Sequence, residues 1–369
     1  MLSLPSRGET RDFLETLLIA TTGSLIAGWA GVPAGFLSGA LVLVAAAGVA
    51  GRPTYVPTQL TNLILFTLGV VLGSAVTPET LKGISTWPLS IVFMAVALVL
   101  IFFCTGGYLR LVHKWDPLSA YFAASPGALS QVVSLAIETK ADLPAIVIVQ
   151  TVRVLLLSIL LPLGLSAFGY AIAGAPAPGT AAAGNAWGEI LILLACCAAV
   201  AFLAHRVKFP GGIIFGSMAA SAVLHGGGFI EARLPTWLTI AAMIGIGSVT
   251  GSRFRGTTPV LLLRYLKAAL GAFAVGICVL IVCVVAVLSL LPLLQVRDVV
   301  LAFSPGAQET MMLLALALNG APVYVGAHHV ARFTMASMAL PLFVRFYGDI
   351  EAREAAEKRR VPTTMTPDE

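Results

Sequence analysis

Twelve apolar segments separated by short polar connections fill almost the whole of this 369-residue chain. They span residues 13–31, 33–50, 58–77, 87–109, 117–137, 143–172, 187–205, 210–224, 236–252, 262–291, 298–318 and 322–346. Several segments reach the roughly 20 residues that a helix needs to cross a bilayer core, whereas the second and eighth are short. Only 11% of the residues are charged, against about 25% in soluble domains. The sequence therefore predicts an all-α polytopic membrane protein whose surroundings are a lipid bilayer.

A four-residue motif, Ser-Pro-Gly-Ala, occurs twice in the chain. Residues 125–128 return as residues 304–307, and the same 179-residue offset carries Arg153 onto Arg332. This pattern predicts an internal duplication, because one offset relates both a motif and a distant charged residue. The predicted organisation is a first membrane repeat over residues 1–172, an Ala/Gly/Pro-rich linker over 173–186, a second repeat over 187–348 and a charged tail over 349–369.

Pairs of glycines four residues apart recur at nearly the same offset. Gly35 and Gly39 match Gly212 and Gly216, and Gly69 and Gly73 match Gly247 and Gly251. Glycines with this spacing let two helix backbones approach closely, so helix packing is the expected role. The packing could lie within one protomer or between protomers, which leaves a homo-oligomer open.

The positions of the basic residues predict how the repeats are oriented, because lysine and arginine are enriched in cytoplasmic loops. If all twelve segments crossed, the basic loops of the two halves would face opposite sides. If segments 117–137 and 298–318 are re-entrant, 17 of the 22 basic residues are cytoplasmic, and only Lys82, Arg233 and Arg297 lie outside. The charge pattern thus favours two inverted-topology repeats, each with about five transmembrane helices and one broken Ser-Pro-Gly hairpin. Both termini are then expected in the cytoplasm.

The two Ser-Pro-Gly breaks predict a polar site within the membrane. Because proline fits the first turn of a helix and serine can cap that turn, Ser125 and Ser304 are predicted to be N-caps of second half-helices. Arg153 and Arg332 lie about ten residues into the segments that follow, roughly 15 Å along a helix, at the depth of the breaks. Helix N-termini carry partial positive charge, so breaks and arginines together predict a midplane site for an anion.

The predicted substrate-binding residues are those of the breaks, the arginines and the polar neighbours of the second break. They are Ser125, Pro126, Gly127, Ala128, Arg153, Ser304, Pro305, Gly306, Gln308, Glu309 and Arg332. Glu309 could neutralise Arg332, whereas the matching position in the first copy is Ser130. The substrate is therefore expected to engage Arg153 most directly. The structural alternative is that each proline only relieves packing, while each arginine pairs with an acid or with carbonyl groups.

Five further polar residues are predicted to line the site or to couple it to a proton: Gln131, Gln150, Asn319, His328 and His329. Adjacent residues on a helix point about 100° apart, so the two histidines are not expected to share one ligand. A packing or hydrogen-bonding role and a proton-coupling role both stay open for them.

The composition argues against several other functions. The +5 net charge comes from basic residues scattered singly between the segments, without the basic, aromatic-interleaved face of a nucleic-acid site. The five histidines and five cysteines form no pattern of metal ligands. No serine, cysteine or lysine is accompanied by a base and an orienting group. Neither catalytic residues nor a metal or cofactor is therefore expected.

The stretches from Leu301 to Met311 and from Val325 to Arg332 resemble the second-repeat signature of the AbrB family of bacterial membrane proteins. Ala128 and Ala307 depart from the family pattern, which commonly has a second glycine there. The resemblance implies a location in the bacterial cytoplasmic (inner) membrane. Members of this family are labelled as transporters, as regulators of gene expression or as ammonia monooxygenases.

Among these functions, inverted repeats with broken hairpins favour a secondary transporter of a small anionic metabolite, with H⁺ or Na⁺ as a coupling ion. The alternative is a membrane-embedded sensor or regulator that influences gene expression indirectly. Such a regulator would need a partner surface, for which the run from Glu351 to Arg360 could form a cytoplasmic helix. A membrane monooxygenase is the least favoured function, because it would require a cluster of metal ligands.

Overall fold

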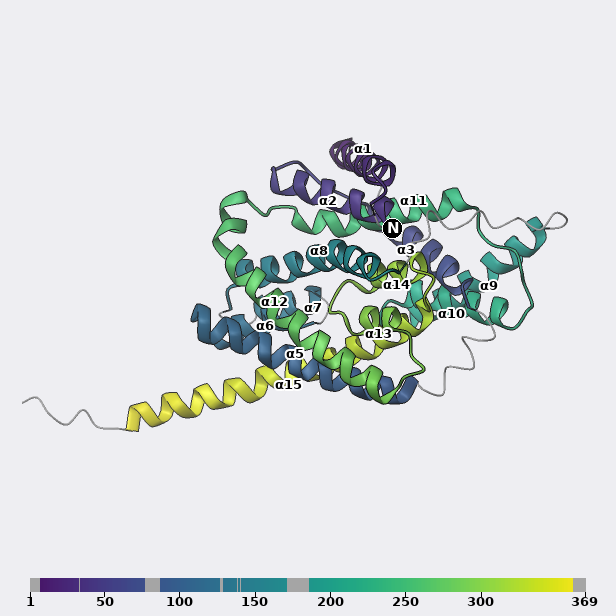
Figure 1. The fold of residues 1–369 in the computed structure, drawn as a ribbon. Coiled ribbons are helices and arrows are strands. Elements are labelled where there is room, and N and C mark those ends of the chain that lie inside the picture. The colour runs from purple at the N-terminus through teal and green to yellow at the C-terminus, as the bar shows by residue number, and fades with distance from the viewer. Residues whose placement is uncertain are drawn as a thin grey trace, which may run out of the picture.

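The computed structural model describes residues 7–32, 34–76, 87–126, 129–137, 139, 141–170 and 186–360. This part of the chain is all-helical, as the sequence predicts (Figure 1). The first half contains α1 (Arg7–Trp29), α2 (Gly35–Val49), α3 (Thr58–Gly73), α5 (Trp87–His113), α6 (Pro117–Ala124), α7 (Leu129–Ile137) and α8 (Leu143–Ala167). The second half contains α9 (Ala186–Arg206), α10 (Gly212–Gly226), α11 (Thr236–Gly251), the short 3-10 helix η2 (Ser252–Phe254), α12 (Pro259–Leu290), α13 (Val296–Phe303), α14 (Gln308–Ala317) and α15 (Pro322–Arg360).

The long apolar helices support a multi-pass membrane protein. Within the described residues, the parts Trp87–His113, Leu143–Ala167, Trp187–Arg206 and Pro259–Leu290 are long and apolar enough to cross a membrane. Large apolar side chains such as Leu18, Phe202 and Val282 are exposed on the surface of these and other helices. A surface of this kind is suited to lipid rather than to water.

The paired glycines pack helices together within the chain. Gly69 and Gly73 of α3 face the backbone of α10, where an added Cβ would overlap Ile214 or Met218. Gly247 of α11 faces α2 in the same way, with Leu37 O only 2.7 Å from the position of a Cβ. The packing role predicted for these glycines is confirmed, and the contact joins the two halves of the molecule.

The predicted segments 117–137 and 298–318 are each broken into two short helices at the Ser-Pro-Gly motif. However, Ser125 and Ser304 are C-caps of α6 and α13, not N-caps of the helices that follow. The Ser304 hydroxyl donates to Val300 O at 2.6 Å, back into α13. The N-cap prediction was wrong because a residue before proline is driven into an extended conformation, so the first helix ends there. In the second copy, α14 begins three residues after the proline, with Ala307 as an N-cap that provides no side-chain hydrogen bond.

Matched hydrogen bonds join the beginning and the end of each broken segment. The Asp142 amide donates to Ser119 Oγ at 2.6 Å, and the Ala321 amide donates to Asp298 Oδ1 at 2.8 Å. Ser119 matches Asp298, and Asp142 matches Ala321, at the 179-residue offset of the Ser-Pro-Gly motif. The chain therefore returns close to its starting point after each break.

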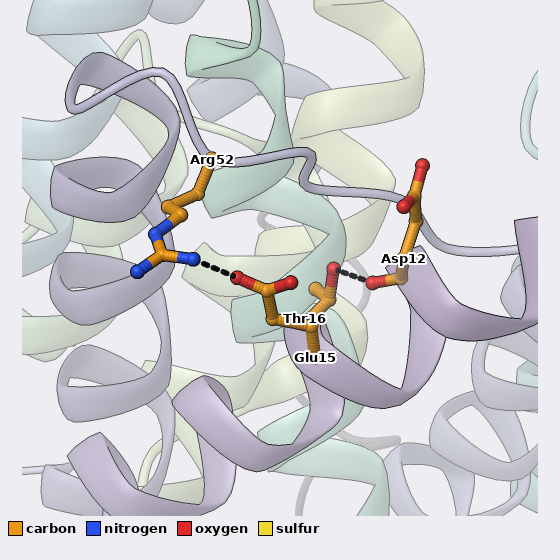
Figure 2. Close-up of polar contacts among 4 residues, drawn as sticks. All are labelled: Asp12, Glu15, Thr16 and Arg52. Atoms are coloured by element: carbon orange, nitrogen blue, oxygen red, sulfur yellow. Dashed lines mark hydrogen bonds and ion pairs between the residues drawn. The ribbon is translucent and has the colours of Figure 1, made fainter. Parts of the chain in front are cut away.

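Figure 2 shows how the connection between α2 and α3 is held against α1. Arg52 in this connection pairs with Glu15 of α1 at 3.3 Å, and Thr16 Oγ1 donates to Asp12 O at 2.7 Å. The Thr16 hydroxyl also accepts from the Tyr55 amide at 2.9 Å. The exposed ion pair contributes only about 0–1 kcal/mol, so it fixes the path of the loop more than it stabilises the fold.

The ends of the repeats are described only in part. Residues 173–185 of the predicted linker and residues 361–369 of the predicted tail lie outside the described residues. α15 continues from Pro322 to Arg360 as one helix and extends away from the rest of the molecule (Figure 1). The helix expected from Glu351 to Arg360 is thus the end of α15.

Candidate functional site

Arg153, near the middle of α8, binds the backbone of the first break. Its Nη1 donates to Ala124 O at 3.2 Å, and its Nη2 donates to Ser125 O at 3.0 Å. These carbonyl groups belong to the C-terminal end of α6, which carries partial negative charge and so attracts a cation. The side chain is 9% exposed, and its Nε has no hydrogen-bond partner in the described part of the chain.

Arg332 of α15 holds the second break in a similar way. Its Nη1 donates to Ser304 O, and its Nη2 donates to Gly306 O at 3.0 Å and to His329 Nδ1 at 2.9 Å. Arg332 is 6% exposed, and its Nε is also without a partner among the described residues. Both arginines thus follow the carbonyl-pairing alternative, yet the buried Nε of each has no partner among the described residues.

Gln150 and His329 form a second matched pair, three residues before each arginine. Gln150 Nε2 donates to Phe122 O at 2.8 Å, and His329 Nε2 lies 3.1 Å from Leu301 O. Since a carbonyl group can only accept, the His329 hydrogen is on Nε2, and Nδ1 accepts from Arg332. A glutamine and a neutral histidine therefore make the same backbone contact in the two copies. The sequence predicted both residues as lining, and the 179-residue offset aligns their positions, but their different residue types gave no indication that they make the same contact.

The two breaks and the two arginines line one cavity of about 470 Å³. The described residues around it are Leu41, Pro126, Leu129, Val133, Gln150, Thr151, Arg153, Val154, Leu155, Thr250, Arg253, Phe254, Pro305, Gly306, Ala307, Gln308, Glu309, His329, Arg332 and Phe333. They come from both halves of the chain, so a cavity of a size that suits a small metabolite lies where the two breaks meet.

The structure brings most of the predicted site residues to this cavity, but not all of them. Ser125 and Ser304 are buried beside it and supply carbonyl groups to the arginines. Gly127 and Ala128 lie outside the described residues, as does the side chain of Gln131. Asn319 is exposed at the end of α14, where its φ of +54° fits the left-handed conformation that ends a helix. Asn319 is not among the residues around the cavity.

His328 is buried on another side of α15, away from the cavity lining. Its Nδ1 lies 2.8 Å from Tyr324 O, and its Nε2 lies 2.8 Å from Ser90 Oγ of α5. The two rings contact different elements, as the 100° between adjacent helical residues predicts.

Glu309 does not neutralise Arg332 through an ion pair. The described contacts include no carboxylate on Arg332, and Glu309 Oε1 accepts from Gln308 Nε2 at 3.3 Å. The guanidinium group is held instead by Ser304 O, Gly306 O and His329, and Glu309 acts on Arg332 only through the electrostatic interaction of their charges. Glu309 instead contributes a half-buried carboxylate to the cavity wall.

The lining residues that the sequence did not predict include two polar side chains of the second half, Arg253 and Thr250. Arg253 of η2 is exposed, so the cavity reaches the surface at this residue. Thr250, at the end of α11, is 3% exposed, and its hydroxyl has no hydrogen-bond partner within the described chain. Arg253 was assigned to a cytoplasmic loop, and its sequence position gave no reason to place it beside the breaks.

At several positions that the duplication makes equivalent, only one of the two residues lines the cavity. Leu41, Thr250 and Phe254 line it, whereas Met218, Leu72 and Val76, at the equivalent positions of the other copy, do not. Met218 and Leu72 belong instead to a buried apolar cluster that includes Met311 and Met312. The cavity therefore opens beside the pair α2 and α11, whereas the equivalent residues of the matching pair, α10 and α3, do not line it.

Comparison with known proteins adds two findings. A family model described as "Transition state regulatory protein AbrB" matches residues 36–348. The chain is also similar to a protein of Bacillus subtilis (strain 168) with the name "Uncharacterized protein YhjN". The two are 25% identical over 381 residues, which cover 94% of this chain and 95% of the relative.

Proposed function

This chain belongs to the AbrB family, and we propose that it is a secondary transporter of a small anionic metabolite. The single observation that carries this proposal is that both helix breaks and both buried arginines line one cavity. Transporters built from repeats bind their substrates where broken helices of the two repeats meet, near the middle of the membrane.

The proposed architecture is a pair of inverted repeats, each with a re-entrant hairpin. The matched bonds from Asp142 to Ser119 and from Ala321 to Asp298 support this proposal, because they hold both ends of each broken segment together. A segment that begins and ends at one level does not cross the bilayer. Each repeat then has five crossings in addition to its hairpin. Because five is an odd number, the second repeat is inverted relative to the first.

The chemistry of the cavity favours an anion. Arg153 and Arg332 each have an unpartnered Nε and are bound to neutral carbonyl groups, which leave their positive charges without a paired carboxylate. The first residues of α14 also line the cavity, and its N-cap, Ala307, has no side-chain acceptor for the free amide groups. Buried charges and uncapped helix N-termini are both stabilised by an anionic ligand.

The one-sided cavity also supports transport. A duplicated molecule can exchange the conformations of its two repeats, which would close the cavity beside Arg253 and open its counterpart near Met218. A coupling ion, H⁺ or Na⁺, would supply the driving force. Glu309 is the carboxylate on the cavity wall and is our candidate for binding that ion.

A thermal-stability screen of the purified protein with a panel of small anions tests this proposal. A ligand that binds the folded protein must raise its unfolding temperature. We expect at least one anion to stabilise the wild type and the control Arg206→Gln, which changes an exposed arginine of α9, but not the Arg153→Gln variant. Proteoliposomes with the wild type or the Arg206→Gln control should take up that anion, whereas those with Arg153→Gln should not. The proposal fails if no anion stabilises the wild type, or if a folded Arg153→Gln variant binds and transports as the wild type does.

The second candidate is a membrane-embedded regulator, which is favoured by the description of the family as regulatory. The extension of α15 to Arg360 would provide the surface for a cytoplasmic partner. Deletion of residues 350–369 separates the two functions. A transporter keeps its flux without this segment, whereas a regulator that depends on a partner loses its effect on gene expression.

A further inference from the structure

The mouth of the cavity contains a third guanidinium group, which the proposed function does not use. Arg253 is exposed at this mouth, and no carboxylate is paired with it in the described structure. We propose, building on the proposed transport of an anion, that the substrate carries two negative charges and that Arg253 binds the second of them.

The balance of charges around the cavity carries this inference. Among the described residues that line the cavity, three are arginines and one, Glu309, carries a carboxylate. His329 adds no charge, because its Nδ1 accepts a hydrogen bond from Arg332 and the ring is neutral. The lining therefore has a net charge of +2, and an anion with a single charge would leave part of it uncompensated. A dianion matches it.

The positions of the three arginines fit recognition at two points. Arg153 and Arg332 are buried and held by the backbone of the breaks, whereas Arg253 lies where the cavity reaches the surface. Thr250 adds a buried hydroxyl without a partner on the same wall, one helical turn before Arg253. One anionic group can thus approach the buried pair while the other stays near the mouth.

The equivalent turn of the first copy is built without an arginine. The offset of 178 residues that relates Gly247 to Gly69 places Ala75 at the equivalent position of the first copy. Of these two equivalent turns, only the one that borders the cavity carries an arginine, as expected for a residue that contacts the substrate.

The ligand class that fits these features is a small dianion, either a dicarboxylate or a phosphate monoester. Two pairs of probes are used. Each pair compares a dianion with a singly charged anion, and the two pairs distinguish a dicarboxylate from a phosphate monoester. Succinate is compared with butyrate, and glycerol 3-phosphate is compared with glycerate, each by its effect on unfolding temperature and by its dissociation constant. We expect the dianion of at least one pair to bind more tightly than its singly charged partner.

Two arginine variants then test the role of Arg253. Arg253→Gln should weaken binding of the preferred dianion by about fivefold, since an exposed charge is partly screened, and should leave the singly charged probe unchanged. The control is Arg255→Gln, which alters an exposed arginine two residues later that lines a separate hollow beside Gly48 and Pro53. This control should bind all probes as the wild type does.

The outcomes separate this inference from the proposed function. If singly charged anions bind as tightly as dianions, or if Arg253→Gln and Arg255→Gln bind dianions equally well, the inference is overturned while transport of an anion stands. If none of the anions binds to the wild type, the proposed function itself fails.

Discussion

At the level of single residues, each buried arginine organises a helix break, while its Nε has no partner among the described residues. Arg153 and Arg332 bind the carbonyl groups that follow α6 and α13. A hydrogen bond to a charged group contributes about 1.5–3 kcal/mol, so these contacts stabilise the breaks themselves. The structural and functional roles considered for the arginines are therefore compatible.

Gln150 and His329 make equivalent contacts, so the residue of one copy should be able to replace the residue at the matching position of the other. His329→Gln should be tolerated, because a glutamine at the matching position already donates to Phe122 O. His329→Leu should lower stability by about 1–3 kcal/mol, because Leu301 O and one donor of Arg332 lose their partner in a buried site. Thermal unfolding in detergent measures both effects. Equal unfolding temperatures for the two variants would contradict this account of the contact.

Sequence reasoning found the arginines and the breaks because both are costly within a membrane and both are duplicated. It did not find the contact from Gln150 to Phe122, since the direction of a side chain depends on how the helices pack. The failed prediction for Ser304 has a local cause. The sequence suggested a cap for the next helix, whereas the extended residue before a proline ends the preceding one.

At the level of elements, paired small residues fix how the two halves pack. α3 packs against α10 through Gly69 and Gly73, and α11 packs against α2 through Gly247 and Gly251. The boundaries of these helices were largely predictable, because prolines, glycines and short polar connections mark their ends. The identity of the partner helix was not predictable, because glycine spacing indicates close approach without saying to what.

A glycine substitution tests this packing. Gly247→Leu should destabilise the protein by about 1–3 kcal/mol or prevent folding, since even a Cβ would lie 2.7 Å from Leu37 O. Gly107→Leu in α5 is the control, because no atom lies within 4 Å of a Cβ placed there. Expression and thermal unfolding compare the variants. If Gly247→Leu were as stable as Gly107→Leu, the tight contact between α2 and α11 would be disproved.

The hydrogen bonds at the base of the broken segments give a second prediction for the elements. Asp298→Ala removes the acceptor for the Ala321 amide and should lower stability by about 1–3 kcal/mol. Asp298→Asn should retain most of the stability, because its side-chain oxygen can still accept. Thermal unfolding measures both variants. If both lowered stability equally, the charge of Asp298 rather than this hydrogen bond would be responsible.

At the level of the whole molecule, the account depends on how the two repeats are oriented. The cavity combines both breaks, yet residues of α2, α11 and η2 line it while the equivalent residues of their counterparts do not. Loop charges predicted the inversion from sequence alone, because the basic residues fall on one side only if the broken segments are re-entrant. The one-sided opening could not be predicted, since a duplicated sequence does not show which of its related helices will border a cavity.

The most direct test of this central claim is the accessibility of single cysteines at the bases of the two broken segments. Ala141→Cys and Asn319→Cys are compared in a background without the exposed native cysteines, Cys104, Cys196 and Cys278. Asn319 is exposed, and unlike Gly320 it leaves room for a side chain beside Asp298. A membrane-impermeant maleimide applied to intact cells and to inverted vesicles should label the two positions from opposite sides. Labelling of both positions from the same side would contradict the inversion and the shared midplane site.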